Sequence, residues 1–411
     1  AIATQSRDRV GGVETYLEAV LPPLARRHAV AFCSASDVIT ERGAIALPPG
    51  VPALTIDRSA RDPLHQLRAW RPDLLFAHGL DDPALEIELL ALAPAVVVQH
   101  TYHGTCISSS KTMTWPEVKG CERAFGAACL ALYFPRRCGG SNPITMARLY
   151  RSQTLRLAGL KRAAAVVTLS AHMKTEMLRN GVRRDRLHVI PPFVSRHEEA
   201  GRADRTDGPG TLLYLGRLER LKGVDRLFDA LRLVAARAGR PVHLIVAGDG
   251  SERLSLQAHA RSIRESDPRI VIDFVGWQDE AGRTKLLAGT DALVVPSLWP
   301  EPFGLVGLEA AAAGVPSIAF ATGGIPEWLR DGENGCLAPS AGGRPDLLAA
   351  AIVRCIGVPE TLARLRTGAF RGAAAWTMQR HLARLEHVFD LARGEAKPVR
   401  VENAMTASRA S

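Results

Sequence analysis

The stretch from Pro296 to Glu309 reads PSLWPEPFGLVGLE and combines the end of a strand, a proline-rich loop and the start of a helix. The apolar run Ala292–Pro296 predicts the strand, and the helix should open at about Gly304, where free backbone N–H groups can bind a phosphate. Glu309 lies one turn inside that helix on an otherwise apolar surface, where a buried carboxylate needs hydrogen-bond donors. Either the two hydroxyls of a sugar diol or the side chain of an arginine could supply them.

The rest of the chain alternates short apolar runs with longer helical patterns, which is typical of β-α-β units and parallel sheets. The predicted strands are Ala1–Gln5, Ala29–Ser34, Ala53–Asp57, Leu74–His78, Ala95–Gln99, Ala165–Ser170, Leu187–Ile190, Thr211–Gly216, His243–Gly248, Val271–Val275, Ala292–Pro296 and Ser317–Phe320. The segment Val194–Gly210 between the two halves is polar and ends in DGPG, which is linker composition. Two doubly wound domains joined there would hold a ligand between the carboxyl ends of their strands.

Composition narrows the class of protein. The 411 residues are 46% hydrophobic and 23% charged, which predicts a soluble globular chain of two domains of about 150–200 residues, without a spanning helix or a secretory leader. A net charge of +10 indicates acidic partners such as nucleotide phosphates or anionic lipid, and an aromatic content of only 5% disfavours nucleic acid. Seven cysteines, an odd number at uneven spacing, argue against a disulfide framework and favour the cytoplasm.

Two further loops combine glycine or basic residues with the start of a helix. Gly11-Gly12 precedes a predicted helix at Val13–Leu24, so backbone N–H groups could approach an anion, although two glycines are more often simply a tight turn. A second loop, LGRLERLKG, follows a predicted strand, and its Arg217 and Lys222 suit the negative charge of a diphosphate leaving group. A solvated basic loop is the alternative.

These motifs resemble those of the family-four, or group 1, retaining glycosyltransferases. Glu301 and Glu309 form that family's Glu-x7-Glu motif, within its longer pattern of Pro-Ser, Glu-x-Phe-Gly and Glu-Ala-x-Ala-x-Gly-x-Pro. Other matching segments, in the family's order, are Gly11-Gly12, Val167–Ser170, Gly216–Gly223, Ala247–Gly250 and Phe274–Gly276. The resemblance implies an α/β GT-B fold, in which two Rossmann-like, doubly wound parallel-sheet domains face a central cleft.

The resemblance also divides the chain and implies a role for each matching residue. The expected parts are an acceptor-side domain at 1–195, a linker at 196–210, a nucleotide-sugar-binding domain at 211–375, a helix at 376–393 that crosses back after Trp376, and a disordered tail at 394–411. Glu309 would bind the ribose hydroxyls, Glu301 the donor-sugar hydroxyls, and Arg217 with Lys222 the diphosphate. The remaining donor-binding positions are Gly11, Gly12, Gly216, Phe274, Val275, Gly276, Phe303, Gly304, Leu305 and Val306, with Phe274–Gly276 beside the base.

His100 completes the expected catalytic set. It follows the predicted strand Ala95–Gln99 and lies six residues before Cys106, where many relatives have His-Asp-x4-Cys, although Thr101 stands here at the Asp position. In the family this histidine approaches the donor sugar near its anomeric carbon. A hydrogen-bonded core histidine is the alternative reading, and His103 is the second choice.

The resemblance implies a mechanism without a metal or other cofactor. No carboxylate nucleophile is obvious in the N-terminal half, and the family is thought to react on one face of the sugar, with the leaving phosphate helping to deprotonate the acceptor. Asp81-Asp82 is the only acidic pair close to a donor-site strand, and it reads as a loop feature.

Two features remain open. Cys106, Cys121, Cys129 and Cys138, with 14, 7 and 8 residues between them, could bind zinc, take part in redox chemistry or simply pack. No acidic residue occurs from Arg123 to Thr175, and one helix there could be amphipathic, with an anionic membrane or solvent as the alternatives for its basic face. The basic and apolar residues of that helix are Arg148, Arg151 and Arg156 with Leu149, Leu155 and Leu157.

The sequence therefore predicts a cytoplasmic enzyme, peripheral on the inner face of the membrane if its basic segment docks there. It would transfer a sugar from a nucleotide-diphosphate sugar, UDP in preference to GDP, to an acceptor in cell-surface polysaccharide, glycolipid or metabolite biosynthesis. A catalytically inactive nucleotide-sugar-binding partner subunit and a nucleotide-sugar epimerase of the same fold are the alternatives. The Glu301-x7-Glu309 context disfavours the epimerase, and intact Arg217, Lys222, Glu301 and Glu309 disfavour the inactive subunit.

Overall fold

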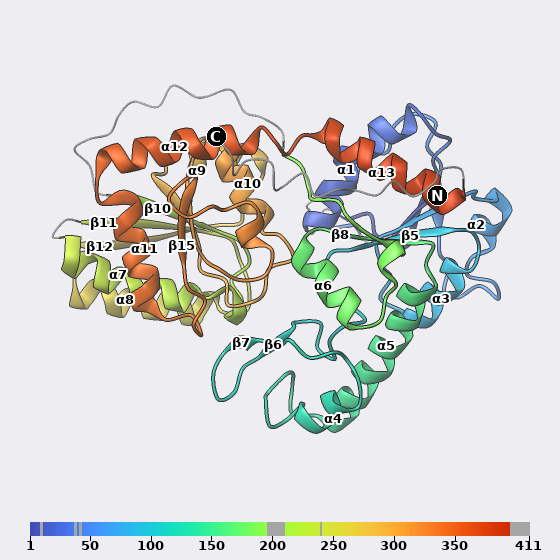
Figure 1. Ribbon diagram of the computed structural model, residues 1–411, viewed down its shortest axis with the longest axis horizontal. Coiled ribbons are helices and arrows are strands. Elements are labelled where there is room, and N and C mark those ends of the chain that lie inside the picture. The colour runs from blue at the N-terminus through green and yellow to red at the C-terminus, as the bar shows by residue number, and fades with distance from the viewer. Residues whose placement is uncertain (9–10, 37–38, 41–42, 195–209, 239–240, 395–411) are drawn as a thin grey trace.

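The computed structural model describes residues 1–8, 11–36, 39–40, 43–194, 210–238 and 241–394 (Figure 1). The linker predicted at 196–210 and the tail predicted at 394–411 lie outside the described residues except at one end of each. Gly210 is the first residue of a strand, and Gly394 is the cap at the end of the last helix.

Seven parallel strands form the first sheet, in the order β3-β2-β1-β4-β5-β8-β9. They are β1 (Ile2–Ser6), β2 (Phe32–Ser36), β3 (Ala53–Thr55), β4 (Leu75–Ala77), β5 (Ala95–Gln99), β8 (Ala165–Thr168) and β9 (Leu187–Val189). Its helical segments are α1 (Gly12–Ala25), α2 (His65–Trp70), α3 (Pro83–Leu90), α5 (Pro143–Arg162), α6 (Ala171–Arg179) and the short η1 (Arg184–Arg186). Alternate residues of β5 face opposite cores, because Val96 packs with Leu17 of α1 and Val97 with Leu89 of α3.

Six parallel strands form the second sheet, in the order β12-β11-β10-β13-β14-β15. They are β10 (Gly210–Leu215), β11 (Val242–Ala247), β12 (Ile270–Gly276), β13 (Ala292–Val295), β14 (Ser317–Phe320) and β15 (Gly335–Ala338). Its helical segments are η2 (Arg220–Lys222), α7 (Val224–Ala238), α8 (Arg253–Ser266), α9 (Glu280–Ala288), α10 (Leu305–Ala312), η3 (Ile325–Glu327), α11 (Pro345–Ile356) and α12 (Pro359–Ala373). The predicted α/β class with two doubly wound parallel sheets is confirmed. The sequence prediction missed only β15 from these sheets, because its run GCLA lacks β-branched residues.

The last helix, α13 (Met378–Arg393), lies against the first sheet although it follows the helices of the second (Figure 1). Its Leu385 and Val388 are buried in one core with Leu17 and Phe76. The chain crosses at Trp376, whose carbonyl accepts a hydrogen bond of 3.0 Å from the backbone N–H of Val194. The two halves are therefore joined at two points of the chain, the first of which lies outside the described residues.

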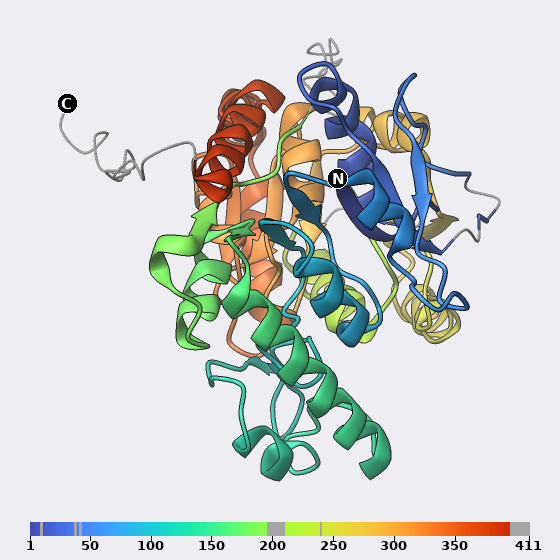
Figure 2. The ribbon, with the colours of Figure 1, turned by 90° about the vertical axis from the view of Figure 1, so that its right-hand side faces the viewer.

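The chain between β5 and β8 includes an extended segment that projects away from the first sheet (Figures 1 and 2). It contains the antiparallel pair β6 (Thr112–Met113) and β7 (Lys119–Gly120), the short helix α4 (Ala128–Leu132) and the N-terminal end of α5. No helix in the described part of the chain combines the length and apolar content needed to cross a bilayer.

The structure corrects the prediction that Arg156 belongs to an exposed basic face of α5. Arg156 is buried, its Nη1 pairs with Glu86, and its Nη2 donates to the carbonyls of Leu80 at 2.6 Å and Asp81 at 2.9 Å. Helical spacing places Arg156 on the same face as Gly159, and this face packs on α3. Leu157 likewise packs against the core of the first sheet.

Candidate functional site

A cavity of about 790 Å³ lies between the two sheets, at the carboxyl ends of their strands. His100 follows β5, Gly216 follows β10, and Pro296 follows β13, so residues at the ends of three strands line the same cavity. The predicted site residues that line it are Gly11, Gly12, His100, Gly216, Arg217, Lys222, Glu301, Phe303, Gly304, Leu305, Val306 and Glu309. This is the cleft position expected for a ligand of a doubly wound fold.

The structure does not bring Phe274, Val275 and Gly276 to this cavity. They lie on β12, the edge strand of the second sheet, and two strands separate β12 from β13. The ring of Phe274 packs edge-on at 6.2 Å from Phe228 on the core side, while Val275 is exposed. The resemblance implied that they lie beside the nucleotide base, but they are not among the residues that line the cavity.

The start of α10 forms one wall of the cavity. Gly304 caps the helix with φ of +91°, a backbone conformation that favours glycine, and the indole N–H of Trp328 donates to the carbonyl of Phe303 at 2.6 Å. A Cβ atom at Gly307 would lie 1.8 Å from the Trp328 ring, so this glycine allows the helix to pack directly on that ring. The free N–H groups of the first turn are therefore held at the cavity wall.

Lys222 and Glu301 form an ion pair at the cavity wall. Glu301 is buried, and its Oε1 accepts hydrogen bonds of 2.7 Å from both Lys222 Nζ and Ser297 Oγ. Lys222 Nζ also lies 4.8 Å from the centre of the Trp299 ring. The turn at Gly223 has φ of +69° and meets the Pro296 carbonyl so closely that a Cβ there would lie 2.1 Å from its oxygen. The loop after β10 is thus pressed onto the end of β13.

Glu309 and Arg217 are more open than the sequence suggested. The Glu309 side chain is 27% exposed, and its Oε2 lies 3.7 Å from Nε of Arg283 on α9. The expectation that the Glu309 carboxylate is buried is therefore wrong. The alternative, an arginine as its partner, is present as Arg283, but only at this long distance. Arg217 is 67% exposed and pairs with Glu219 at 2.6 Å. Both side chains are exposed enough to reach a ligand in the cavity.

His100 belongs to a cluster of rings at the other wall. Its Nε2 lies 2.9 Å from Nδ1 of His78, and burial lowers the pKa of His100 to about 4. Burial, with His100 beside it, lowers the pKa of His78 well below its usual value. His103, the second choice, does not line the cavity, and burial together with Arg156 lowers its pKa to about 4.

Sequence reasoning missed several residues that contribute to this site. Tyr16 and Arg283 line the cavity, while His78 and His381 hold its ring cluster from behind. Tyr16 was the easiest to find, since it lies one turn after Gly12 on α1. The other three depend on contacts between elements that are distant in sequence.

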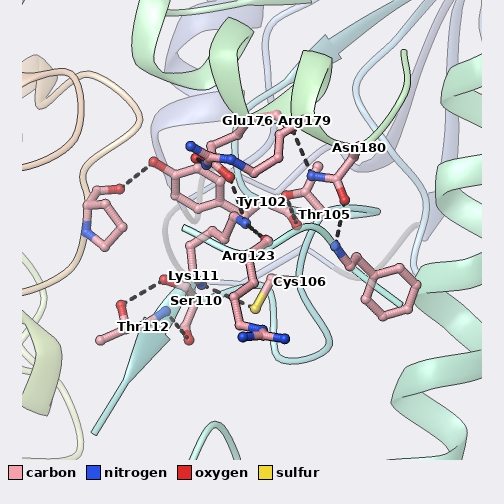
Figure 3. A network of polar contacts seen from close by, with 12 residues as sticks. Tyr102, Thr105, Cys106, Ser110, Lys111, Thr112, Arg123, Glu176, Arg179 and Asn180 are labelled. Atoms are coloured by element: carbon pink, nitrogen blue, oxygen red, sulfur yellow. Dashed lines mark hydrogen bonds and ion pairs between the residues drawn. The ribbon is translucent and has the colours of Figure 1, made fainter. Parts of the chain in front are cut away.

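The two halves also meet directly beside the cavity. Tyr102 Oη donates to the carbonyl of Pro300 at 2.7 Å, and both residues are buried. Glu327 of the second half accepts hydrogen bonds from the N–H groups of Ala171 and His172 at the start of α6, at 2.9 and 3.0 Å. A carboxylate is favoured at a helix N-terminus. Behind Tyr102, Lys111, Glu176 and the start of the extended segment form a polar network (Figure 3).

The structure bears on two candidates for metal binding. Asp82 caps α3, where its carboxylate accepts hydrogen bonds from the N–H groups of Ala84 and Leu85 at 2.9 and 3.3 Å. This structural role agrees with its interpretation as a loop feature. Cys106, Cys121, Cys129 and Cys138 are free thiols. Among the described residues, no three His, Cys, Asp or Glu side chains are grouped so that they could hold a metal ion. The zinc interpretation of the cysteines therefore gains no support.

Comparison with known proteins places this arrangement in a family. A glycogen synthase of Mycobacterium tuberculosis is 29% identical over 282 residues, which are 65% of this chain and 56% of the enzyme, so the chain spans about half the length of that curated relative. A sucrose-phosphate synthase from Thermosynechococcus elongatus shares the fold with a TM-score of 0.70 and 18% identity over 96% of this chain and 99% of that one. HepE of Anabaena in complex with UDP-glucose has a TM-score of 0.64 and 19% identity over 95% and 97%.

Two family models match consecutive parts of the chain. Glycosyltransferase Family 4 matches residues 10–198, and Glycosyl transferases group 1 matches residues 195–371. All the residues that line the cavity fall within these matches. The chain therefore belongs to the family-four, group 1 glycosyltransferases.

Proposed function

We propose that this protein transfers a sugar from a nucleotide-diphosphate sugar, a UDP-sugar in preference to a GDP-sugar, to a hydroxyl acceptor with retention of anomeric configuration. One observation carries the proposal: the cavity between the sheets combines Arg217, Lys222 and the start of α10 with the start of α1 opposite. Cations and helix N-termini that converge on one space suit a diphosphate. The structure of HepE, which shares the fold, holds UDP-glucose, and this supports the preference for UDP.

The two glutamates would divide the donor between them. Oε1 of Glu301 is occupied by Lys222 and Ser297, whereas no described residue donates to its Oε2, which is left for a sugar hydroxyl. Glu309, one turn inside α10 and partly exposed, would accept from the ribose hydroxyls. The N–H groups of the first turn of α10 would then face the diphosphate between ribose and sugar.

Bond exchange would occur on one face of the sugar. The bond between the anomeric carbon and the diphosphate oxygen breaks, a bond to the acceptor oxygen forms, and the acceptor proton moves to the leaving diphosphate. Lys222 and Arg217 would stabilise the charge that grows on that diphosphate, so the step needs no metal ion. His100, on the opposite wall of the cavity, would contact the donor sugar near its anomeric carbon.

A panel of nucleotide sugars tests the activity. The protein should release nucleotide from at least one donor, slowly with water alone and faster with an acceptor, and mass spectrometry should identify the glycosylated product. Binding of UDP without release from any donor would instead indicate an inactive binding subunit. Conversion of the donor into an isomeric sugar would indicate an epimerase.

Glu309→Ala should weaken binding of free UDP by about 2–3 kcal/mol, because hydrogen bonds from the ribose hydroxyls to a charged carboxylate are lost. Isothermal titration calorimetry would show this as a dissociation constant raised by about 30- to 150-fold. Glu265→Ala is the matched control, since it removes an exposed carboxylate of α8 that does not line the cavity. If Glu309→Ala binds UDP as wild type does, the ribose assignment is incorrect.

An acceptor carried on an anionic membrane is also part of the proposal. Ile144, Arg148 and Arg151 are exposed and lie at i, i+4 and i+7 on α5, so they form one stripe. Trp115 is exposed on the same extended segment, and Arg137 lies 4.7 Å above its ring. Basic side chains beside apolar and aromatic ones suit the interface of an anionic bilayer. Arg156 and Leu157 are excluded from this surface because they pack inside the protein.

Liposome sedimentation checks this surface. The protein should pellet with anionic vesicles at low salt and not with neutral ones, and salt at about 0.5 M should release it by screening. Arg148→Ser with Arg151→Ser should reduce pelleting and spare UDP binding, whereas Arg261→Ser with Arg264→Ser, two exposed arginines of α8, should have no effect. Equal recovery with both kinds of vesicle would make the stripe a solvated face.

A further inference from the structure

Two imidazoles share one hydrogen bond at the wall of the cavity. His78 and His100 stack with their ring centres 5.2 Å apart, and His78 Nδ1 lies 2.9 Å from His100 Nε2. His100 lines the cavity and His78 lies behind it. Because Nε2 of His100 is occupied by His78, Nδ1 is the nitrogen left for a ligand.

The direction of that hydrogen bond follows from the far side of His78. Its Nε2 is buried, and no described group forms a hydrogen bond with it. If His100 donated, the proton of the neutral His78 ring would sit on Nε2 as a buried N–H without an acceptor, which is rare in native proteins. If His78 donates from Nδ1, Nε2 carries only a lone pair, and no buried N–H is left unpaired.

The surrounding rings are fixed in the same way. The carbonyl of Pro191 can only accept, so His381 Nδ1 donates to it at 2.7 Å. Burial lowers the pKa of His381 to about 4, so its Nε2 is bare at neutral pH and accepts from the hydroxyl of Tyr16 at 2.8 Å. The Tyr16 ring then packs edge-on against His100 at 6.0 Å. The cluster is therefore held by hydrogen bonds on both sides.

We propose that His78 is a positioning residue: its Nδ1–H donates to His100 Nε2, holds His100 as the Nδ1-protonated tautomer and so presents an N–H donor to the sugar of the bound donor. The inference rests on the proposed function, in which His100 contacts that sugar. A ring that presents an N–H stabilises oxygen as its negative charge grows and cannot take the acceptor's proton. The proton must then go to the leaving diphosphate, as the proposed bond exchange requires.

Long-range ¹H–¹⁵N spectra of the full chain with ¹⁵N-labelled histidine test the tautomer directly. His100→Gln assigns the His100 signals by their loss. In the wild-type protein at neutral pH, His100 should show a protonated Nδ1 and a bare Nε2. His78→Phe keeps a ring but removes the donor, so His100 should become a mixture of tautomers. His78→Asn, whose amide N–H can replace Nδ1–H, should restore the wild-type pattern.

Kinetics separate positioning from packing. In His78→Phe, kcat for release of UDP from UDP-glucose should fall by about tenfold, the effect of one hydrogen bond, while the dissociation constant for UDP stays within about twofold. His78→Asn should recover most of the rate. A wild-type His100 protonated on Nε2, or a His78→Phe protein with unchanged tautomer and rate, would overturn the proposal. A protein that neither binds UDP nor releases it would refute the proposed function, while the spectra would still decide the tautomer.

Discussion

Lys222→Ala should lower kcat for sugar transfer by about 100- to 1000-fold, the usual effect of removing one fixed partner of a developing negative charge. Lys222 is the cation most firmly held at the cavity: Glu301 fixes its Nζ at 2.7 Å, the Trp299 ring lies beside it, and Gly223 locks the loop onto β13. Arg217 is 67% exposed and less constrained, so its replacement should cost less. Steady-state kinetics with the donor found by the panel would measure both effects.

Stability has to be measured beside the rate, because the substitution leaves the buried Glu301 without its ammonium partner. Lys222→Arg keeps a positive charge and should lose less activity, whereas Arg220→Ala, an exposed neighbour that does not line the cavity, should behave as wild type. Activity should also persist in EDTA if lysine and arginine alone neutralise the diphosphate. A Lys222→Ala protein with a normal rate and a lower melting temperature would make the ion pair purely structural.

Much of the fold could be predicted because parallel strands buried on both faces leave a clear pattern of apolar runs. Ala95–Gln99 and Ser317–Phe320 were predicted with their observed bounds, and the other predicted strands overlap observed ones. The start of β2 was placed three residues early, at Ala29 in place of Phe32, because the apolar run begins before the pairing with β1 does. Local pattern does not show where a ladder of hydrogen bonds begins.

The site residues also fall into those that could be predicted from the sequence and those that could not. Residues inside a recognisable local motif, such as Glu301 or Gly304, line the cavity as expected. Arg156 is an exception, because its charge predicts a surface position but Glu86, 70 residues earlier, supplies a buried partner. The same limit applies to His78, which becomes informative only when folding places it against His100. Pairings over such separations leave no local signal in a single sequence.

The polar network behind Tyr102 anchors the extended segment to α6 (Figure 3). The side chains of Lys111 and Glu176 are 2% and 4% exposed, with Nζ 2.6 Å from Oε2, and Nζ also donates to the carbonyl of Arg123 at 2.5 Å. Arg179 pairs with the other oxygen of Glu176. A buried ion pair of this kind stabilises little relative to apolar residues, but loss of one partner is costly.

Glu176→Ala should therefore lower the free energy of unfolding by about 3–5 kcal/mol, because it strands the Lys111 ammonium in the interior. Urea denaturation would measure this loss. Lys111→Met should cost less, since Glu176 keeps Arg179, and the double variant Lys111→Met with Glu176→Met should recover much of the loss. Cys106, whose sulfur accepts from the N–H of Lys111 at 3.3 Å, should react faster with a thiol reagent in Glu176→Ala while buried Cys355 stays protected. A single Glu176→Ala variant within about 1 kcal/mol of wild type would show that water or a shifted loop replaces the carboxylate, and the pair would not be the anchor of the segment.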